Sequence, residues 1–252
     1  MNKHLGNQII EKLKEKSPIS IEELAEKLFV SKSTIRRKLN HLQDNGIVTR
    51  SYGKAYYNDT KHFMPAFGIR KADHSEEKKK ITFEALKFIK DGYTIFLDAS
   101  TSAHFLAQYL SEFKNLTVIT NGVDTLSTLA SMQITAYSTG GKVCTENSSA
   151  LVGLTPLNSI PKIHADIFFF SVKSVDNDGN FYDISDEENE VRRLMMENSS
   201  KSILLCDSSK FGYTTTFKLC NIKDIDVIIT DKDTIKDLSI QEEDLPLTII
   251  CK

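Results

Sequence analysis

Apolar residues recur every three or four positions through the first 46 residues of the chain, as they do in amphipathic helices. Helices are predicted at residues 4–16, 20–28 and 31–46. Ser20 and Glu23 have the spacing of a capping box at the start of the second helix. Three short helices joined by short turns are typical of a helix-turn-helix module with a supporting first helix.

The third predicted helix is basic and rich in hydroxyl groups at its start, and no acid precedes Asp44. Ile35, Leu39 and Leu42 form its single apolar stripe, which must be buried. The other faces suit the major groove of DNA, where cations neutralise phosphates and polar groups contact base edges. The candidate DNA-binding residues of this helix are Ser31, Lys32, Ser33, Thr34, Arg36, Arg37 and Lys38. Taken alone, the pattern also fits the solvated face of an ordinary helix.

Two short runs with strand character follow the third helix and are separated by a Tyr-Gly turn. They predict a two-stranded β-hairpin, the wing of a winged helix-turn-helix. Arg50 and Lys54 fall near its tip, where they would lie along the phosphate backbone of DNA. We therefore predict a winged DNA-binding domain over residues 1–58 and a polar, irregular linker over residues 59–75.

Strand-like and helical patterns alternate from residue 76 to residue 252. The predicted strands lie at residues 94–97, 116–119, 134–137, 166–172, 203–206, 226–229 and 247–250. Helices are predicted at residues 76–90, 103–110 and 123–132. This alternation is typical of an α/β domain with a doubly wound, mostly parallel sheet.

Composition and charge are those of a globular protein with a basic amino-terminal module. Residues 1–60 hold 11 Lys and Arg against 7 Asp and Glu, whereas the remainder holds 21 against 27. This asymmetry favours directed contact with nucleic acid over nonspecific binding of polyanions. No apolar run approaches the roughly 20 residues that cross a bilayer, and the charged start predicts no secretory signal. The four cysteines lack metal-binding spacing, so we expect a cytoplasmic protein without disulfides, metal or cofactor.

Polar segments follow five of the predicted strands, at the edge of a doubly wound sheet where ligands bind. Residues 98–102 open a helix, so that hydroxyl and backbone N–H groups converge there. Residues 120–122 and 139–141 follow the next two strands, and Lys173 and Lys210 follow later ones. Hydroxyls, glycines and two lysines together suggest a small anionic ligand such as a phosphate ester. Each segment alone also fits an ordinary helix cap or turn.

Motifs in a fixed order run through nearly the whole chain. In the amino-terminal part they comprise Val30, Ser31, Thr34, Ile35, Arg36, Arg37, Leu39, Leu42, Gly46 and Arg50. In the remainder they comprise Phe67, Arg70, Glu77, Lys78, Leu97, Asp98, Ala99, Thr120, Asn121, Gly140, Gly141, Gly153 and residues 207–212. This set resembles the signature of the DeoR family of bacterial transcriptional regulators.

The resemblance implies a carboxyl domain with the fold of ribose-5-phosphate isomerase and the coenzyme A transferases. It also implies sensing of a phosphorylated sugar or related metabolite, and repression of a sugar-metabolism operon by binding double-stranded operator DNA. The implied effector pocket comprises Asp98, Ser100, Thr101, Ser102, Thr120, Asn121, Gly140, Gly141, Lys173 and Lys210. We further expect a homo-oligomer, because one winged module offers few contacts to DNA.

The chain departs from the family pattern at six positions. They are Lys38 for aspartate, Lys54, Ser100, Ser171 and Ser174 for glycines, and Ser102 for threonine. A Cβ where a backbone would approach a phosphate can narrow a pocket, so a degenerate, non-sensing carboxyl domain remains an alternative. A sugar-phosphate isomerase is a further alternative, with Asp98, Asp176 and Lys173 as its acid-base groups. No second acid is fixed by spacing, and we predict no catalytic residue.

Overall fold

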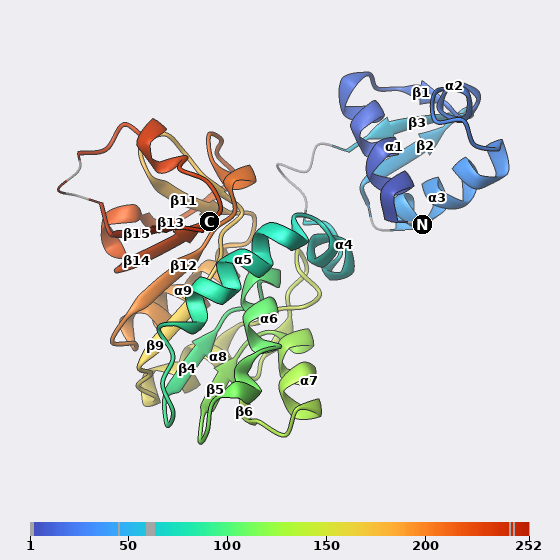
Figure 1. The fold of residues 1–252 in the computed structure, drawn as a ribbon. Helices are drawn as coiled ribbons and strands as arrows, with labels where there is room; N and C mark the ends of the chain where they lie inside the picture. The colour runs from blue at the N-terminus through green and yellow to red at the C-terminus, as the bar shows by residue number, and fades with distance from the viewer. Residues whose placement is uncertain (1–2, 45, 59–63, 242, 244, 252) are drawn as a thin grey trace. The chain divides into compact units, whose positions relative to one another are not determined.

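The chain folds into two compact units, Met1–Ile69 and Arg70–Lys252 (Figure 1). The computed structural model describes residues 3–44, 46–58, 64–241, 243 and 245–251. The predicted linker is not irregular throughout, because helix α4 (Phe67–Ala72) lies within it. Residues 59–63 of that linker are outside the described residues.

The first unit is a winged helix-turn-helix, as predicted. Its helices are α1 (Lys3–Glu15), α2 (Ile21–Lys27) and α3 (Lys32–Asp44), and its strands are β1 (Ile19–Ser20), β2 (Val48–Ser51) and β3 (Lys54–Tyr57). The Ser20 hydroxyl accepts a hydrogen bond from the Glu23 N–H at 3.1 Å and so begins α2. The predicted two-stranded wing gains a third strand, because Ile19 of β1 pairs with Ala55 of β3.

The core of the first unit contains the predicted apolar stripe of α3. Ile35, Leu39 and Leu42 are buried against Ile9 and Leu13 of α1. This packing fixes which face of α3 points inward and leaves its polar faces outside.

The second unit is a layered α/β domain. Its helices are α5 (Ser75–Leu86), α6 (Thr101–Ala107), α7 (Val123–Ser131), α8 (Leu154–Ser159) and α9 (Asp186–Glu197). Short 3-10 helices are η2 (Leu110–Glu112), η3 (Ile160–Lys162), η4 (Ser208–Lys210), η5 (Ile222–Asp224) and η6 (Ile235–Asp237). The strands of its main sheet are β4 (Thr94–Leu97), β5 (Thr117–Thr120), β6 (Thr135–Ser138), β9 (Ile167–Phe170), β12 (Ser202–Leu205), β14 (Val227–Thr230) and β15 (Leu247–Ile250).

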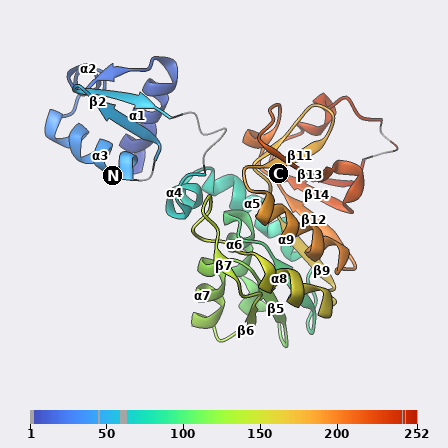
Figure 2. The ribbon, with the colours of Figure 1, turned by 180° about the vertical axis from the view of Figure 1, so that it is seen from behind.

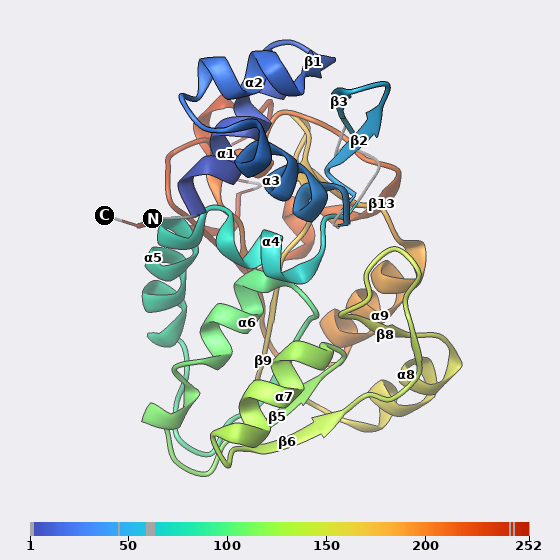
Figure 3. The same cartoon turned by 90° about the vertical axis from the view of Figure 1, so that its right-hand side faces the viewer.

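The main sheet has seven strands in the order β6-β5-β4-β9-β12-β14-β15, and its neighbouring strands are parallel. Helices α5, α6 and α7 cover one face, where α6 packs against both of the others (Figures 1 and 3). Helices α8 and α9 cover the other face (Figure 2). The predicted doubly wound, parallel sheet is therefore confirmed.

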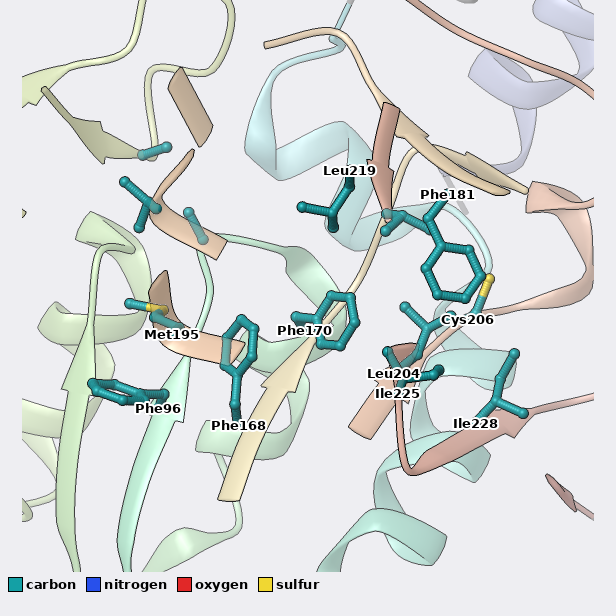
Figure 4. Close-up of a cluster of buried hydrophobic side chains, with 14 of the residues drawn as sticks. Phe96, Phe168, Phe170, Phe181, Met195, Leu204, Cys206, Leu219, Ile225 and Ile228 are labelled. Carbon is teal, nitrogen blue, oxygen red and sulfur yellow. The ribbon is translucent and has the colours of Figure 1, made fainter. Parts of the chain in front are cut away.

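Alternate residues of the central strands enter two hydrophobic clusters, one on each face of the sheet. Phe169 packs with α5 and α6, whereas Phe168 and Phe170 pack with α9. The Phe168 and Phe170 rings stack with centroids 4.9 Å apart, and Phe96 meets Phe168 edge to face (Figure 4). Burial on both faces explains why these strands are continuous apolar runs in the sequence.

Two helices and two small sheets of the second unit were not predicted. They are α8, α9, the hairpin β7 (Lys142–Val143) and β8 (Leu151–Val152), and the sheet formed by β10 (Ser174–Val175), β11 (Asn180–Asp183) and β13 (Phe217–Asn221). Helix α9 begins with five consecutive polar residues, 186–190, so its first turn has no apolar residue from which a helical spacing could be recognised. No helix of the described residues is long and apolar enough to cross a membrane.

Candidate operator-binding and effector-binding sites

The exposed face of α3 carries the arginines that the sequence predicted to contact DNA. Arg36 and Arg37 are exposed, whereas Ile35 and Leu39 of the same helix are fully buried. Consecutive residues lie about 100° apart around a helix, so the two guanidinium groups point in different directions. If α3 lay in the major groove of DNA, the two guanidinium groups would therefore contact different parts of the DNA.

The hydroxyl-rich start of α3 is also the cap of the helix. The Ser31 hydroxyl accepts the Thr34 N–H at 3.2 Å, and its oxygen lies 2.8 Å from the Ser33 hydroxyl. Lys32 forms an ion pair of 3.0 Å with Glu22 of α2, and both side chains are about half exposed. Such surface pairs contribute little energy, so Lys32 can exchange Glu22 for a phosphate at little cost.

The two wing cations occupy different positions. Lys54 is exposed beside the turn, whereas Arg50 lies further down β2 and pairs with Ala55 in the strand register. Arg50 Nε donates to Gln43 Oε1 of α3 at 2.6 Å, which joins the wing to the helix. Tyr52 lies at the tip of the wing and is 99% exposed; its sequence position predicted only a turn.

The strand order of the second unit places a switch point between β4 and β9. The chain moves outward from β4 toward β6, then returns to β9 and moves outward in the other direction. Ligands of doubly wound sheets bind beyond the carboxyl ends of the strands at such a point. Asp98 follows β4 here, and Lys173 follows β9.

The Asp98 carboxylate holds these two strand ends together. It accepts hydrogen bonds from the backbone N–H groups of Ser100 and Ser171 at 3.1 and 3.2 Å. Its second oxygen also accepts from Arg192 Nε at 3.0 Å, and Asp98 is buried. The predicted effector contact of Asp98 is therefore a carboxylate that already has three donors within the protein.

Other predicted effector residues serve local structure at the same edge. The Ser100 hydroxyl caps α6 by accepting the Ala103 N–H, and Thr101 and Ser102 are buried in the first turn. Because α6 has only seven residues, its dipole gives a bound anion limited support. The Thr120 hydroxyl accepts the Gly122 N–H at 2.9 Å.

Gly140 and Gly141 are required by packing beyond β6. Gly141 has φ +115°, and a Cβ there would lie 2.4 Å from the Val152 carbonyl oxygen. A Cβ on Gly140 would lie 2.9 Å from a methyl group of Thr155. These contacts give both glycines a structural reason independent of any ligand.

Four cations gather near the ends of β9 and β12, and we call them the cationic cluster: Arg70, Lys78, Lys173 and Lys210. Lys210 Nζ donates to the Val172 carbonyl at 2.8 Å, and Lys78 Nζ donates to the Asp73 carbonyl at 2.6 Å. Arg70 Nη2 donates to Asn147 Oδ1 at 2.8 Å. These bonds hold charges from α4, α5, the β9 end and η4 in one region.

The positive charges of the cationic cluster repel one another. Burial, followed by the charge of Lys210, lowers the pKa of Lys78 to about 8. Burial and the Lys210 charge likewise lower the pKa of Lys173 to about 8. Burial lowers the pKa of Arg70 despite nearby carboxylates. Nearby carboxylates act in the other direction, Asp207 and Asp73 on Lys78 and Asp183 and Asp73 on Lys173, but both pKa values remain lowered. A further anion beside these ammonium groups would offset the remaining cost of their charge.

Two members of the cationic cluster were not predicted as site residues. Arg70 and Lys78 belong to the family motifs, but their place in the sequence predicted no role in ligand binding for either. Lys78 shares the buried face of α5 with Ile81, Thr82 and Ala85. A lysine at i, followed by buried residues at i+3, i+4 and i+7, was the signal that could have revealed it. Arg192 and Glu188 were missed because α9 was missed.

Comparison with known proteins agrees with this two-part architecture. Residues 73–232 match the family model described as DeoR C terminal sensor domain, and residues 6–61 match the DeoR-like helix-turn-helix domain. The chain is 35% identical over 246 residues to the HTH-type transcriptional regulator GolR of Listeria innocua, with 96% of each protein covered. It is 30% identical over 225 residues to the glycerol-3-phosphate regulon repressor of Escherichia coli, with 89% of each covered.

Among solved structures, the chain is similar to ribose 5-phosphate isomerase A from Methanocaldococcus jannaschii, with a TM-score of 0.42, 17% identity and 55% of each chain covered. It is also similar to translation initiation factor eIF-2B from Pyrococcus horikoshii, with a TM-score of 0.46, 12% identity, and 88% and 86% of the chains covered. Neither likeness is strong enough to bear on activity.

The family models cover both units, and relatives at 30% identity or more align along most of the chain. The resemblance noted in the sequence is thus confirmed. This protein belongs to the DeoR family of DNA-binding transcriptional regulators.

Proposed function

We propose that this regulator represses a sugar-metabolism operon and that a phosphorylated sugar bound at the cationic cluster controls its affinity for operator DNA. The observation that carries the proposal is the gathering of Lys78, Lys173 and Lys210 at the strand ends, where the charge of Lys210 lowers the pKa of both Lys78 and Lys173. A phosphate group carries up to two negative charges and accepts several charge-assisted hydrogen bonds. It would therefore stabilise all three ammonium groups together.

The cationic cluster also includes the segment that leads to the DNA-binding unit. Arg70 is the first residue of the second unit and lies in α4, and Lys78 donates to the carbonyl groups of Arg70 and Asp73. A phosphate that draws Lys78 or Arg70 toward itself would alter these bonds. Such a change gives the effector a route to the position of α4, and so to operator affinity.

The name of one relative supports a phosphate ester as the effector class, and the name of another supports a link to sugar use. One is described as a glycerol-3-phosphate regulon repressor, and another, from Escherichia coli, as an L-fucose operon activator, 29% identical over 226 residues. Since the family includes both kinds of regulator, repression is the part of the proposal that transcription measurements must test.

The partners we propose are double-stranded operator DNA and a second copy of the chain, in the cytoplasm, where operators are found. One winged module presents few cations, so paired modules on paired half-sites would supply the missing contacts. Sedimentation of the full chain tests this part separately. A monomer at the concentrations that bind operator would contradict it.

A sugar-phosphate isomerase is less well supported by the geometry. An acid-base carboxylate must be available to the substrate, but the Asp98 carboxylate already accepts three hydrogen bonds within the protein. One observation favours the alternative of a degenerate, non-sensing domain. Ser171 stands where the family pattern has glycine, and its hydroxyl donates to the Leu205 carbonyl at 2.6 Å.

Calorimetry with inorganic phosphate and a panel of sugar phosphates tests the proposal, alongside operator titrations with and without each compound. Lys210→Ala should retain operator affinity but lose the response to the effector, with at least a tenfold weaker effector Kd. Lys79→Ala is the control for removal of a lysine outside the cationic cluster, because Lys79 is exposed and pairs with Glu76. If no phosphate compound binds the wild type, the degenerate-sensor alternative replaces this one. Turnover of a sugar phosphate would instead favour the enzyme.

A further inference from the structure

A buried carboxylate of α9 has one oxygen with donors and one without. Glu188 is 1% exposed. Its Oε2 accepts from Asn147 Nδ2 at 3.1 Å and lies 3.4 Å from Arg192 Nη2. Its Oε1 is also buried, and no residue of the described chain donates a hydrogen bond to it. A buried acceptor without a donor is costly, so Oε1 is a position where a donor would be stabilising.

Glu188 is connected to the switch point by a network of buried polar side chains. Arg192 lies between Glu188 and Asp98, the residue that follows β4. Asn147, which donates to Glu188, accepts from Arg70 of the cationic cluster. The Asn147 side chain therefore bridges the Glu188 carboxylate and Arg70, which places the carboxylate beside the cationic cluster.

A second acceptor of the same kind follows the neighbouring strand β5. Asn121 is buried, and its Nδ2 donates to the Leu151 carbonyl at 3.2 Å. Its Oδ1 has no donor among the described residues. The segment that Asn121 contacts begins near Asn147, the partner of Glu188. Two acceptors without donors therefore lie around one segment, 147–151.

The complementary ligand group is a neutral donor. Arg192 and Arg70 already supply positive charge around Glu188, and a further ammonium group would add its own desolvation cost. A hydroxyl group donates one hydrogen bond and brings no charge. Burial raises the pKa of Glu188, and a donor on Oε1 would favour the ionised carboxylate.

We propose that Glu188 recognises the sugar part of the effector, with Oε1 accepting a hydrogen bond from a hydroxyl of the molecule whose phosphate the cationic cluster binds. The inference rests on the proposed function. It adds to that function a division of the effector site into two subsites, one for the phosphate and one for a hydroxyl. Glu188 is then the residue that distinguishes a sugar phosphate from inorganic phosphate.

Glu188→Gln gives a sharp test, because the surroundings fix how the amide would lie. Asn147 Nδ2 and Arg192 Nη2 both direct donors at the Oε2 position, so the amide oxygen takes that place. The amide NH₂ then takes the Oε1 position and replaces an acceptor with a donor. The matched control is Glu187→Gln, because Glu187 is the preceding residue, is 39% exposed and pairs with Lys142.

The experiment measures, by calorimetry on the full chain, the Kd of inorganic phosphate, of the best-binding sugar phosphate in the panel and of its mono-deoxy analogues. For the wild type and Glu187→Gln, removal of one particular hydroxyl should weaken binding about 10- to 100-fold, the range for hydrogen bonds to charged groups. For Glu188→Gln, the parent compound should bind more weakly than it binds the wild type, and removal of that hydroxyl should cost less affinity, because the hydroxyl can only accept from the neutral amide and loses its bond to a carboxylate. Inorganic phosphate should bind all three proteins equally.

The outcomes separate this inference from the proposed function. If neither inorganic phosphate nor any sugar phosphate binds the wild type, the proposed function fails first. If sugar phosphates bind but Glu188→Gln keeps the wild-type preference for every hydroxyl, the assignment of Glu188 is wrong. If Glu188→Gln does not fold, the wild type alone decides, because mono-deoxy analogues that all bind within about threefold of the parent would overturn the inference.

Discussion

Arg192 of α9 and Asp98 at the end of β4 form an ion pair of 3.0 Å in which both side chains are almost completely buried. Arg192 also lies 3.0 Å from Asp183 of β11. One guanidinium group therefore connects the main sheet, the small antiparallel sheet and the helix between them. This arginine holds the end of β4 at the switch point through its ion pair with Asp98.

Replacing Arg192 with Met should destabilise the second unit strongly, because Asp98 and Asp183 would remain buried without their cation. Removal of one partner of a buried pair costs about 3–5 kcal/mol. Urea unfolding followed by circular dichroism measures the change. The first unit has a separate core formed by residues before Arg70, so its own transition should not move.

Arg193→Met is the control for that substitution. Arg193 is the next residue of α9, but it is 38% exposed, its ion pair with Asp186 is 3.6 Å long, and its other bonds go to the neutral Lys218 and Leu219 carbonyls at 2.8 and 3.3 Å. Its loss should cost about 1–2 kcal/mol, less than the loss of Arg192, because no carboxylate would remain buried without a cation. Equal effects of the two substitutions would show that the Arg192 pairs do not hold the unit together.

Arg36 and Arg37 should differ in their effect on operator binding. The two exposed side chains point about 100° apart, so we expect one to contact a base edge and the other a phosphate. Alanine at the base-contacting position should cost about 1–3 kcal/mol and relax sequence preference, whereas alanine at the other should weaken all sequences alike. Titration of operator and mutated-operator duplexes measures both. Wild-type affinity and selectivity in both variants would exclude α3 as the recognition helix.

Lys38 and Lys54 should each contribute one phosphate contact. Substitution of either by Gln should reduce the slope of log K against log salt by roughly 1 without changing sequence preference. Fluorescence anisotropy at several salt concentrations gives the slope. An unchanged slope in both variants would mean that neither ammonium group reaches the DNA backbone.

The elements that sequence analysis predicted are those with strong local patterns. The apolar stripe of α3 and the continuous apolar runs of β9 and β12 are local properties, and they gave the winged module and the parallel sheet. Helix α9 lacks such a pattern, since it opens with 186–190, and its buried Glu188 and Arg192 look like surface charges in sequence. Only the tertiary structure pairs them with Asp98 and Asn147.

The candidate effector site also combines features that the sequence predicts with contacts that only the tertiary structure shows. The strand-end rule located Asp98 and Lys173, because it depends on topology that the sequence indicates. The rule could not distinguish Asp98, whose carboxylate accepts hydrogen bonds within the protein, from Lys173, whose positive charge is destabilised by burial and by the charge of Lys210. Nor could it reveal Arg70, whose contact with Asn147 spans 77 residues of sequence.

Effector binding should depend on pH because Lys78 and Lys173 titrate near neutrality. Their pKa values are lowered to about 8 from an ordinary value of 10.5. Both ammonium groups therefore lose their protons as the pH rises through about 8, and the attraction for a phosphate falls with them. Below about pH 6 the phosphate itself becomes a monoanion, so affinity should be greatest between about pH 6.5 and 8.

The same shifts predict the sign of proton exchange. A bound phosphate favours the charged lysines and raises their pKa, so binding near pH 8 should take up protons from the buffer. Calorimetry in two buffers of different ionisation enthalpy measures this uptake directly. Lys78→Met should bind more weakly and take up fewer protons, whereas Lys79→Ala should behave as the wild type. A sugar-phosphate affinity that stays constant from pH 7 to 9.5 would show that neither lysine is near the bound phosphate.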